Sequence, residues 1–248
     1  MSETAEEIAS ALPRDLDALP RRRGFRLRGL EMTRLEGFVD ATFAFAVTML
    51  IIAGQQVPDD VSALLAAFRH VPAFAASIIV LAIFWRGHWV WSRRFGLEDT
   101  VSIWISWALI FTMLIYVYPL KVIFGGMFAA LTEARVGQAI GVRSTGEARA
   151  IFAVYALGFS ALALEIVLLN LRAWSLRDAL RLDAREALLT RGAIEGWAIP
   201  FLLGLVSFAF AMLLPRGHIA WSGWIYYSMA LLLPLHTSWL RRRVARLA

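Results

Sequence analysis

Long apolar stretches separated by short polar or charged segments dominate the pattern along this chain of 248 residues. A helix needs about 20 mostly apolar residues to cross a bilayer, and six stretches reach that length. They lie near residues 35–54, 70–92, 101–124, 149–171, 193–214 and 219–240. The pattern predicts an all-α fold, a polytopic integral membrane protein with six transmembrane helices.

Composition agrees with this class, because 59% of the residues are hydrophobic and the mean hydropathy is +0.63. If the loops alternate sides, 18 Arg and Lys residues fall on one side and 6 on the other. Basic loops face the cytoplasm, so both termini are predicted to be cytoplasmic. This distribution of arginines favours a role in membrane topology over nucleic-acid binding. We expect a multi-pass protein of the inner (plasma) membrane, surrounded by the lipid bilayer.

The same layout predicts three parts. Residues 1–33 form an arginine-rich cytoplasmic tail, interpreted as mobile, residues 34–240 the six-helix transmembrane domain, and residues 241–248 a basic cytoplasmic C-terminus. Between the fourth and fifth spans, leucines among charges from Trp174 to Thr190 predict a separate short amphipathic helix.

The first apolar stretch carries a carboxylate, Asp40, and two hydroxyls at membrane depth, where polar groups are costly and often functional. At about 100° per residue, one helix face collects several of its side chains while Asp40 points well away from it. That face holds Phe38, Ala41, Phe45, Thr48 and Ile52. We expect it to line a pore while the other face pairs inside the subunit.

Polar residues of the next two stretches lie at a depth similar to that of Asp40. They predict a hydrogen-bonded cluster of Asp40 with His88 and either Ser102 or Ser106, with the Trp85 indole as a further donor. This cluster is either a proton-sensitive gating element or a static brace between helices. A second group, Glu165, Asn170, Glu195 and His236, is interpreted as partly wetted residues near helix ends.

The sequence argues against an enzyme. It has no cysteine and no pattern of a zinc protease, a serine hydrolase, a phosphate loop or a dinucleotide site. We therefore expect no catalytic residues, no bound metal and no cofactor.

Three motifs then resemble those of the transmembrane protein 175 family of potassium channels. The first is the run R-L-E-G-F-V-D-A-T-F-A-F-A-V-T-M-L-I-I from Arg34, which is similar to that family's first-helix signature. The second combines Ala76-Ser77-Ile78 with Phe84-Trp85-Arg86-Gly87-His88, and the third is Pro119 at the outer end of the third helix. The resemblance covers about residues 34–125.

This resemblance implies a six-helix subunit that assembles as a homotetramer around a pore lined by the first helix and passes monovalent cations, K+ above all. It places the constriction at Phe45, Thr48 and Ile52. It also implies a structural or gating network that includes Arg34, Asp40, Trp85 and His88.

Two positions depart from the family pattern. Val39 stands where the motif has serine, and Phe45 stands where the narrowest position normally has isoleucine or leucine. A phenylalanine ring either turns aside or seals the pore by dewetting. Two alternatives therefore stay open, a proton-coupled secondary transporter and a non-conducting membrane structural protein.

Overall fold

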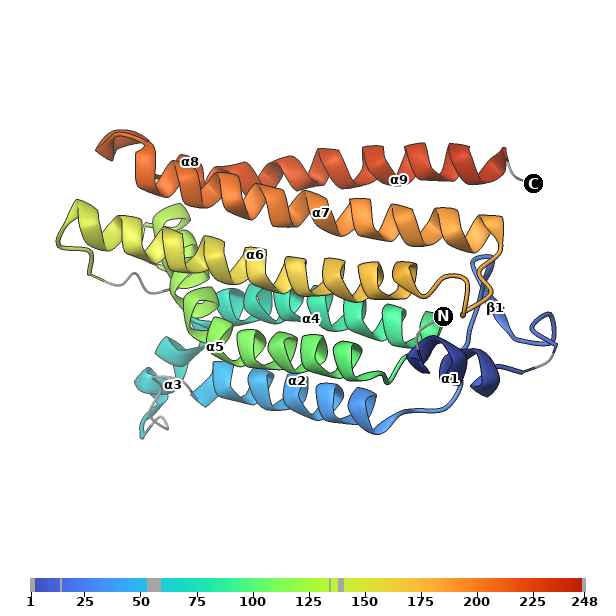
Figure 1. Ribbon diagram of the computed structural model, residues 1–248. Coiled ribbons are helices and arrows are strands. Elements are labelled where there is room, and N and C mark those ends of the chain that lie inside the picture. Colours follow the sequence, from blue (N-terminus) through green and yellow to red (C-terminus); the bar gives the residue numbers. More distant parts are fainter. Residues whose placement is uncertain (1–2, 14, 53–58, 134, 138–140, 247–248) are drawn as a thin grey trace.

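The computed structural model describes residues 3–13, 15–52, 59–133, 135–137 and 141–246. Over these residues the chain forms a bundle of long helices with short elements at both ends (Figure 1). The long helices are α2 (Arg34–Ile52), α4 (Val71–Phe95), α5 (Thr100–Leu131), α6 (Thr145–Ser175), α7 (Ala184–Leu213) and α9 (Met229–Ala245). The short elements are α1 (Glu3–Ala11), β1 (Arg21–Arg22), β2 (Phe25–Arg26), α3 (Val61–Phe68), α8 (Trp221–Trp224) and the 3-10 turns η1 (Arg216–His218) and η2 (Ile225–Ser228).

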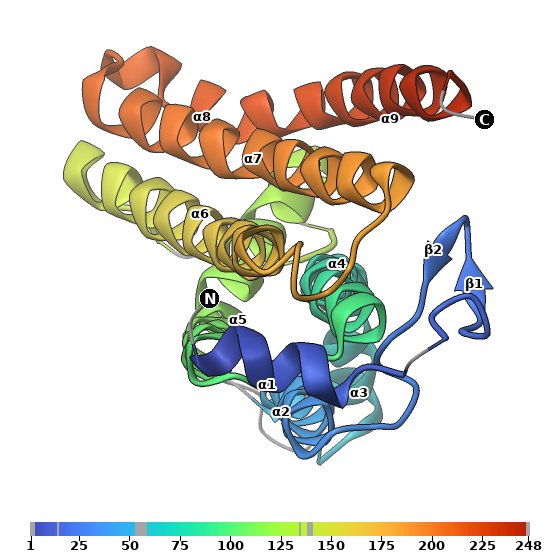
Figure 2. The same ribbon diagram turned by 45° about the vertical axis from the view of Figure 1, so that its right-hand side comes forward.

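Successive long helices run in opposite directions, so α1 and the end of α9 lie at the same end of the bundle (Figure 1). Helix α6 packs between α5 and α7, and α9 packs against α7. Helix α2 lies at the opposite edge from α7 and α9, against α4 and α5 (Figures 1 and 2).

Among the described residues, four helices are long and apolar enough to cross a membrane: α4, α5, α6 and α7. Helix α2 is not among them; its 19 residues include Arg34, Glu36 and Asp40. The last predicted span is divided into α8, η2 and α9, of which α9 has 17 residues and ends in arginines. The only strands in the described part are the two short ones of the hairpin, so the fold is helical as predicted.

The predicted amphipathic helix between Trp174 and Thr190 is wrong. Helix α6 continues to Ser175, and α7 already begins at Ala184. A capping box explains this start: Asp183 Oδ1 accepts the Glu186 N–H at 2.8 Å, and Glu186 Oε2 accepts the Asp183 N–H at 3.2 Å. The leucines of this segment therefore belong to the turn after α6 and to the first turns of α7.

Small residues and one indole hold the middle of the bundle together. A Cβ added at Gly204 of α7 would meet the Ala156 carbonyl oxygen at 3.1 Å, so this glycine permits close approach of α6 and α7. On the other side of α6, the Trp91 indole N–H of α4 donates to the Leu169 carbonyl at 2.8 Å. The indole thereby satisfies its donor inside an apolar core.

The N-terminal segment is not the mobile tail that the sequence suggested. Arg23 and Gly24, with φ of 54° and 80°, form the two-residue turn between β1 and β2. The turn delivers Phe25 into the core, where it is 0% exposed and its ring meets Phe95 edge-on at 5.4 Å. The hairpin is thus packed against the end of α4.

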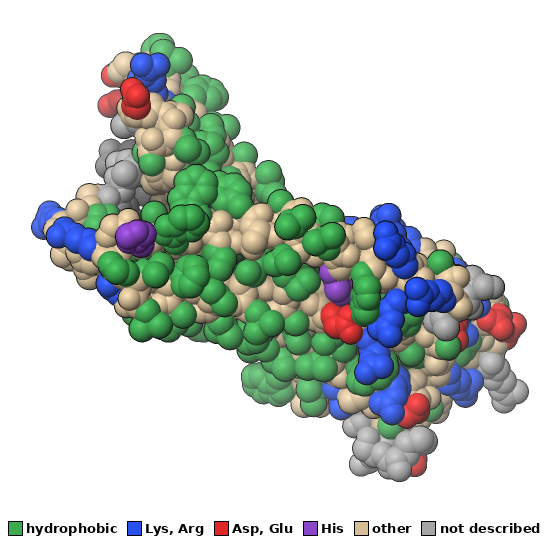
Figure 3. All heavy atoms as spheres, turned by 90° about the horizontal axis from the view of Figure 1, so that it is seen from above, with side chains coloured by type: hydrophobic (Ala, Val, Ile, Leu, Met, Phe, Trp, Pro, Cys, Tyr) green, Lys and Arg blue, Asp and Glu red, His purple; other side chains and the backbone are tan. Residues whose placement is uncertain are grey.

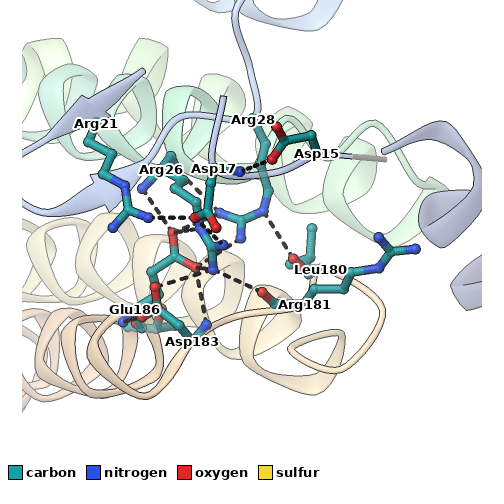
Figure 4. Close-up of polar contacts among 10 residues, drawn as sticks. Asp15, Asp17, Arg21, Arg26, Arg28, Leu180, Arg181, Asp183 and Glu186 are labelled. Carbon is teal, nitrogen blue, oxygen red and sulfur yellow. Dashed lines mark hydrogen bonds and ion pairs between the residues drawn. The ribbon is translucent and has the colours of Figure 1, made fainter. Parts of the chain in front are cut away.

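Glu186 fastens this hairpin to the start of α7 (Figure 4). Its fully buried carboxylate accepts from Arg26 Nη2 at 2.8 Å and from Arg28 Nη2 at 2.9 Å. The hydrogen bond to Glu186 raises the pKa of the Arg26 guanidinium, against the opposing effect of its burial. We call Arg26, Arg28 and Glu186 the Glu186 cluster. It connects the α6–α7 turn to the segment that leads into α2.

Replacing Glu186→Gln should destabilise the protein by about 3 kcal/mol, because buried Arg28 loses its carboxylate partner and Arg26 keeps only Asp17 and Asp183. The measurement is the free energy of unfolding of the purified protein in detergent. Asp178→Asn is the control, since the Arg177–Asp178 pair is exposed and should change stability by less than about 1 kcal/mol. Equal effects of the two substitutions would contradict this account.

Candidate pore-lining helix and its polar anchors

One face of α2 packs inside the subunit and the other does not. The packed face carries Val39, Ala46 and Leu50, which are 1%, 0% and 3% exposed. On the opposite side Phe38 and Phe45 are 49% and 55% exposed. This division follows the helical period of α2, and it leaves a largely apolar face outside the packing of the subunit.

The residues that the sequence placed on that face lie there as far as the structure describes them. Phe38, Ala41, Phe45 and Thr48 are all exposed. Ile52 is the last residue of α2, and its side chain lies outside the described part of the chain.

Two threonines of α2 make the same local bond on different faces. The Thr48 hydroxyl donates to the Ala44 carbonyl at 3.0 Å, and the Thr42 hydroxyl donates to the Phe38 carbonyl at 2.8 Å. Thr48 is exposed, whereas Thr42 is 8% exposed. Because a hydroxyl oxygen keeps lone pairs after donating its proton, Thr48 presents an oxygen ligand on the free face.

Asp40 is anchored to α4. Its Oδ1 accepts from the Trp85 indole N–H at 2.6 Å, and the Trp85 ring stacks on Phe43 at 5.5 Å. A charge-assisted bond of this kind is among the stronger ones in proteins. It ties the polar side of α2 to α4 and so fixes the rotation of α2 about its axis.

The cluster predicted around Asp40 forms only in part. Trp85 donates to Asp40 and His88 meets Ser106, as expected, but the structure divides these contacts into two separate pairs. His88, 2% exposed, lies 3.1 Å from Ser106, with its Nε2 facing the serine hydroxyl. Ser102 instead donates to Asp99 at 2.6 Å at the start of α5. The depth argument placed Asp40 beside His88, but the Asp40 carboxylate bonds to Trp85, almost one helical turn deeper.

Arg34 begins α2 and is exposed, close to exposed Glu31. Glu36, by contrast, points inward: it is 2% exposed, and its Oε1 lies 3.2 Å from Arg93 Nε. Arg93 also donates to the Leu30 carbonyl at 2.9 Å.

Sequence reasoning treated Arg93 only as a topology charge and missed this role. Helices α2 and α4 are antiparallel, so Glu36 and Arg93 lie at similar depth. This similarity in depth could have predicted the ion pair from the sequence. A further missed residue is Thr112 of α5, whose hydroxyl donates to Glu165 at 2.7 Å.

The other polar residues singled out in the sequence have ordinary partners. The Asn170 amide donates to the Ile166 carbonyl at 2.8 Å, and His236 lies 3.3 Å from Glu195. Within the described part of the chain, no three His, Cys, Asp or Glu side chains gather as they would around a metal ion.

The comparisons with known proteins begin with the part of the bundle that contains α2. Residues 34–119 match the family described as endosomal/lysosomal potassium channel TMEM175. A protein of Marivirga tractuosa named potassium channel is 30% identical over 213 residues, which cover 82% of this chain and 85% of that protein. The chain belongs to the TMEM175 potassium channel family. The family resemblance read from the three motifs is thereby confirmed.

A solved TMEM175 structure extends the similarity to nearly the whole fold. It is a crystal structure of a variant of the potassium channel MtTMEM175 in complex with a nanobody–MBP fusion protein. The TM-score is 0.77 at 26% identity, covering 91% of this chain and 99% of that one. The prediction of a multi-helix membrane protein is confirmed, and TMEM175 proteins are ion channels and not enzymes.

Trp85→Phe should lower the free energy of unfolding by about 1.5–3 kcal/mol, because it leaves the Asp40 carboxylate without this hydrogen bond. Trp104→Phe is the matched control, since Trp104 is 68% exposed and the same change removes no bond of this kind. Unfolding in detergent measures both. A loss from Trp85→Phe no larger than that of the control would show that the bond does not anchor α2.

Proposed function

We propose that this chain forms a homotetrameric, potassium-permeable cation channel whose pore is lined by α2. The observation that carries the proposal is the uncovered face of α2, where Phe45 and the Thr48 hydroxyl project from an edge helix. Membership of the TMEM175 family and the names of the two relatives support the same reading. Permeant K+ is then the ligand, and no cofactor is required.

In this proposal the subunit crosses the inner (plasma) membrane six times, with both termini in the cytoplasm. The membrane domain spans residues 34–240, between the cytoplasmic segment 1–33 and the basic end 241–248. Two features support this topology: the alternating direction of the long helices (Figure 1), and the gathering of Lys and Arg side chains at the end of the molecule where α9 terminates (Figure 3). Hydrophobic side chains cover the middle of the same view.

Four copies of α2 around an axis would stack rings of Phe45, Thr48 and Ile52 along the pore. An apolar ring gates by dewetting, and a ring of hydroxyl oxygens replaces part of the hydration shell of a cation. Asp40 and Trp85 act as the brace that holds this face toward the axis. Behind it, His88 with Ser106 links α4 to α5, and Ser102 with Asp99 forms a local bond at the start of α5.

The brace reading fits the contacts better than proton coupling does. A proton-coupled transporter needs Asp40 and His88 to act together, yet they bond different partners, Trp85 and Ser106. The non-conducting alternative rests on Phe45 alone. Ion flux through the natural protein, compared with flux through Phe45→Ala, distinguishes it from the channel.

Thr48→Val should lower the K+/Na+ permeability ratio by about threefold, equivalent to about 0.7 kcal/mol of differential ion binding. Thr42→Val is the control, because it removes the same hydroxyl and the same backbone bond from the packed face of α2. The measurement is flux of K+ and Na+ from liposomes containing purified protein.

Equal changes in the two valine variants would contradict the proposed ring. Uptake against a gradient would favour the transporter. Flux that appears only after Phe45→Ala would identify the natural chain as a plugged, non-conducting assembly. A native mass other than four subunits would overturn the tetramer independently of conduction.

A further inference from the structure

Five arginines line one pocket beside the cytoplasmic end of α4. The pocket has a volume of about 100 Å³, and its arginines are Arg22, Arg23, Arg86, Arg93 and Arg94. Arg93 is paired with Glu36. Among the described side chains, none of the other four forms an ion pair with a carboxylate. The pocket therefore concentrates positive charge that the described protein does not balance.

Aromatic rings hold two of these guanidinium groups in place. Arg22 lies over the Trp89 ring at 5.0 Å, and Arg94 lies over the Phe25 ring at 4.9 Å. Stacking of this kind orients a guanidinium without neutralising it. The hydrogen-bond donors of both arginines remain available to an anion.

Arg86 is the most unusual member. It lies nine residues before Phe95, the last residue of α4, or about 13 Å along the helix. An arginine this far inside a membrane helix is costly and normally has a partner. Its long side chain can reach the arginine pocket, as its place in the lining shows.

A large apolar groove continues from the same place. Its volume is about 1,230 Å³, above the usual range of about 300–1,000 Å³ for small-molecule pockets. Its lining comes from α4 to α9 and includes Ile83, Phe84, Leu189, Trp197, Leu233 and Leu240. Arg86 and Arg94 line both the groove and the arginine pocket, so the two spaces meet at these side chains.

We propose that the pocket and groove together bind one anionic phospholipid. The phosphate headgroup occupies the arginine pocket, and an acyl chain runs along the groove. Charge complementarity selects this occupant: a phosphate beside an acyl chain matches unbalanced arginines at the mouth of an apolar groove, as in basic pockets between membrane helices. The site lies on α4 and its neighbours, away from the free face of α2, and it is independent of whether the channel conducts.

Native mass spectrometry of the purified full-length protein tests this, with dioleoylphosphatidylglycerol or dioleoylphosphatidylcholine added. We expect phosphatidylglycerol to be retained in preference. The double variant Arg23→Gln/Arg86→Gln should weaken its binding about tenfold or more, since each arginine near a membrane surface contributes about 1 kcal/mol. The double variant Arg241→Gln/Arg242→Gln is the control, because it removes the same charge from exposed residues at the same end of the bundle.

The substitution Gly196→Leu tests the groove separately from the arginine pocket. A Cβ at Gly196 meets only His236 ring atoms, at 3.5 and 3.6 Å, so there is room for a Cβ, and the rest of the leucine side chain would occupy the groove that Gly196 lines. We expect weaker phosphatidylglycerol binding with the oligomer unchanged. The proposal is overturned if both double variants lose lipid equally, if phosphatidylcholine binds as well, or if inorganic phosphate alone displaces the lipid. It is also overturned if Gly196→Leu breaks the oligomer while lipid binding persists, because the groove would then be a contact between subunits.

Discussion

The hydrogen bond between Asp40 and Trp85 fixes which way α2 faces. A carboxylate at membrane depth needs a donor, and the indole N–H of the neighbouring helix supplies it at 2.6 Å. At about 100° per residue, Phe45 lies about 140° around the helix from Asp40. Anchoring the carboxylate on α4 therefore turns Phe45 away from the subunit, and the face proposed to line the pore is set by a contact behind it.

A second set of ionic contacts holds the N-terminal end of the same helix. Glu36 is paired with Arg93, and Arg93 also binds the Leu30 carbonyl just before α2. Further back along the chain, the Glu186 cluster joins the segment before α2 to the turn between α6 and α7. The N-terminal segment and the α6–α7 turn thus meet beside the segment that leads into α2.

Hydropathy and helical period correctly predicted much of the fold and part of the candidate site. They located the long helical segments and placed Phe38, Phe45 and Thr48 on one face of α2, because burial in a helix follows its period. They failed where contacts between residues far apart in the sequence determine the structure. The start of α7 depends on a capping box whose glutamate also binds two arginines about 160 residues away, and no local pattern reveals that. Likewise Asp40 bonds to Trp85, as expected, but His88 bonds elsewhere, because a depth estimate from helix ends is uncertain by about one turn.

The absence of cysteine from the natural sequence allows the most direct test of the central claim, that α2 faces a conducting axis. Thr48→Cys would place one thiol per subunit on the free face of α2, and Ala46→Cys would place one on the packed face, where Ala46 is 0% exposed. The measurement is K+ flux from liposomes before and after a water-soluble, positively charged thiol reagent. Block of the Thr48→Cys protein with no effect on the Ala46→Cys protein is the predicted result. Flux through the Thr48→Cys protein that survives complete modification would contradict a pore lined by this helix.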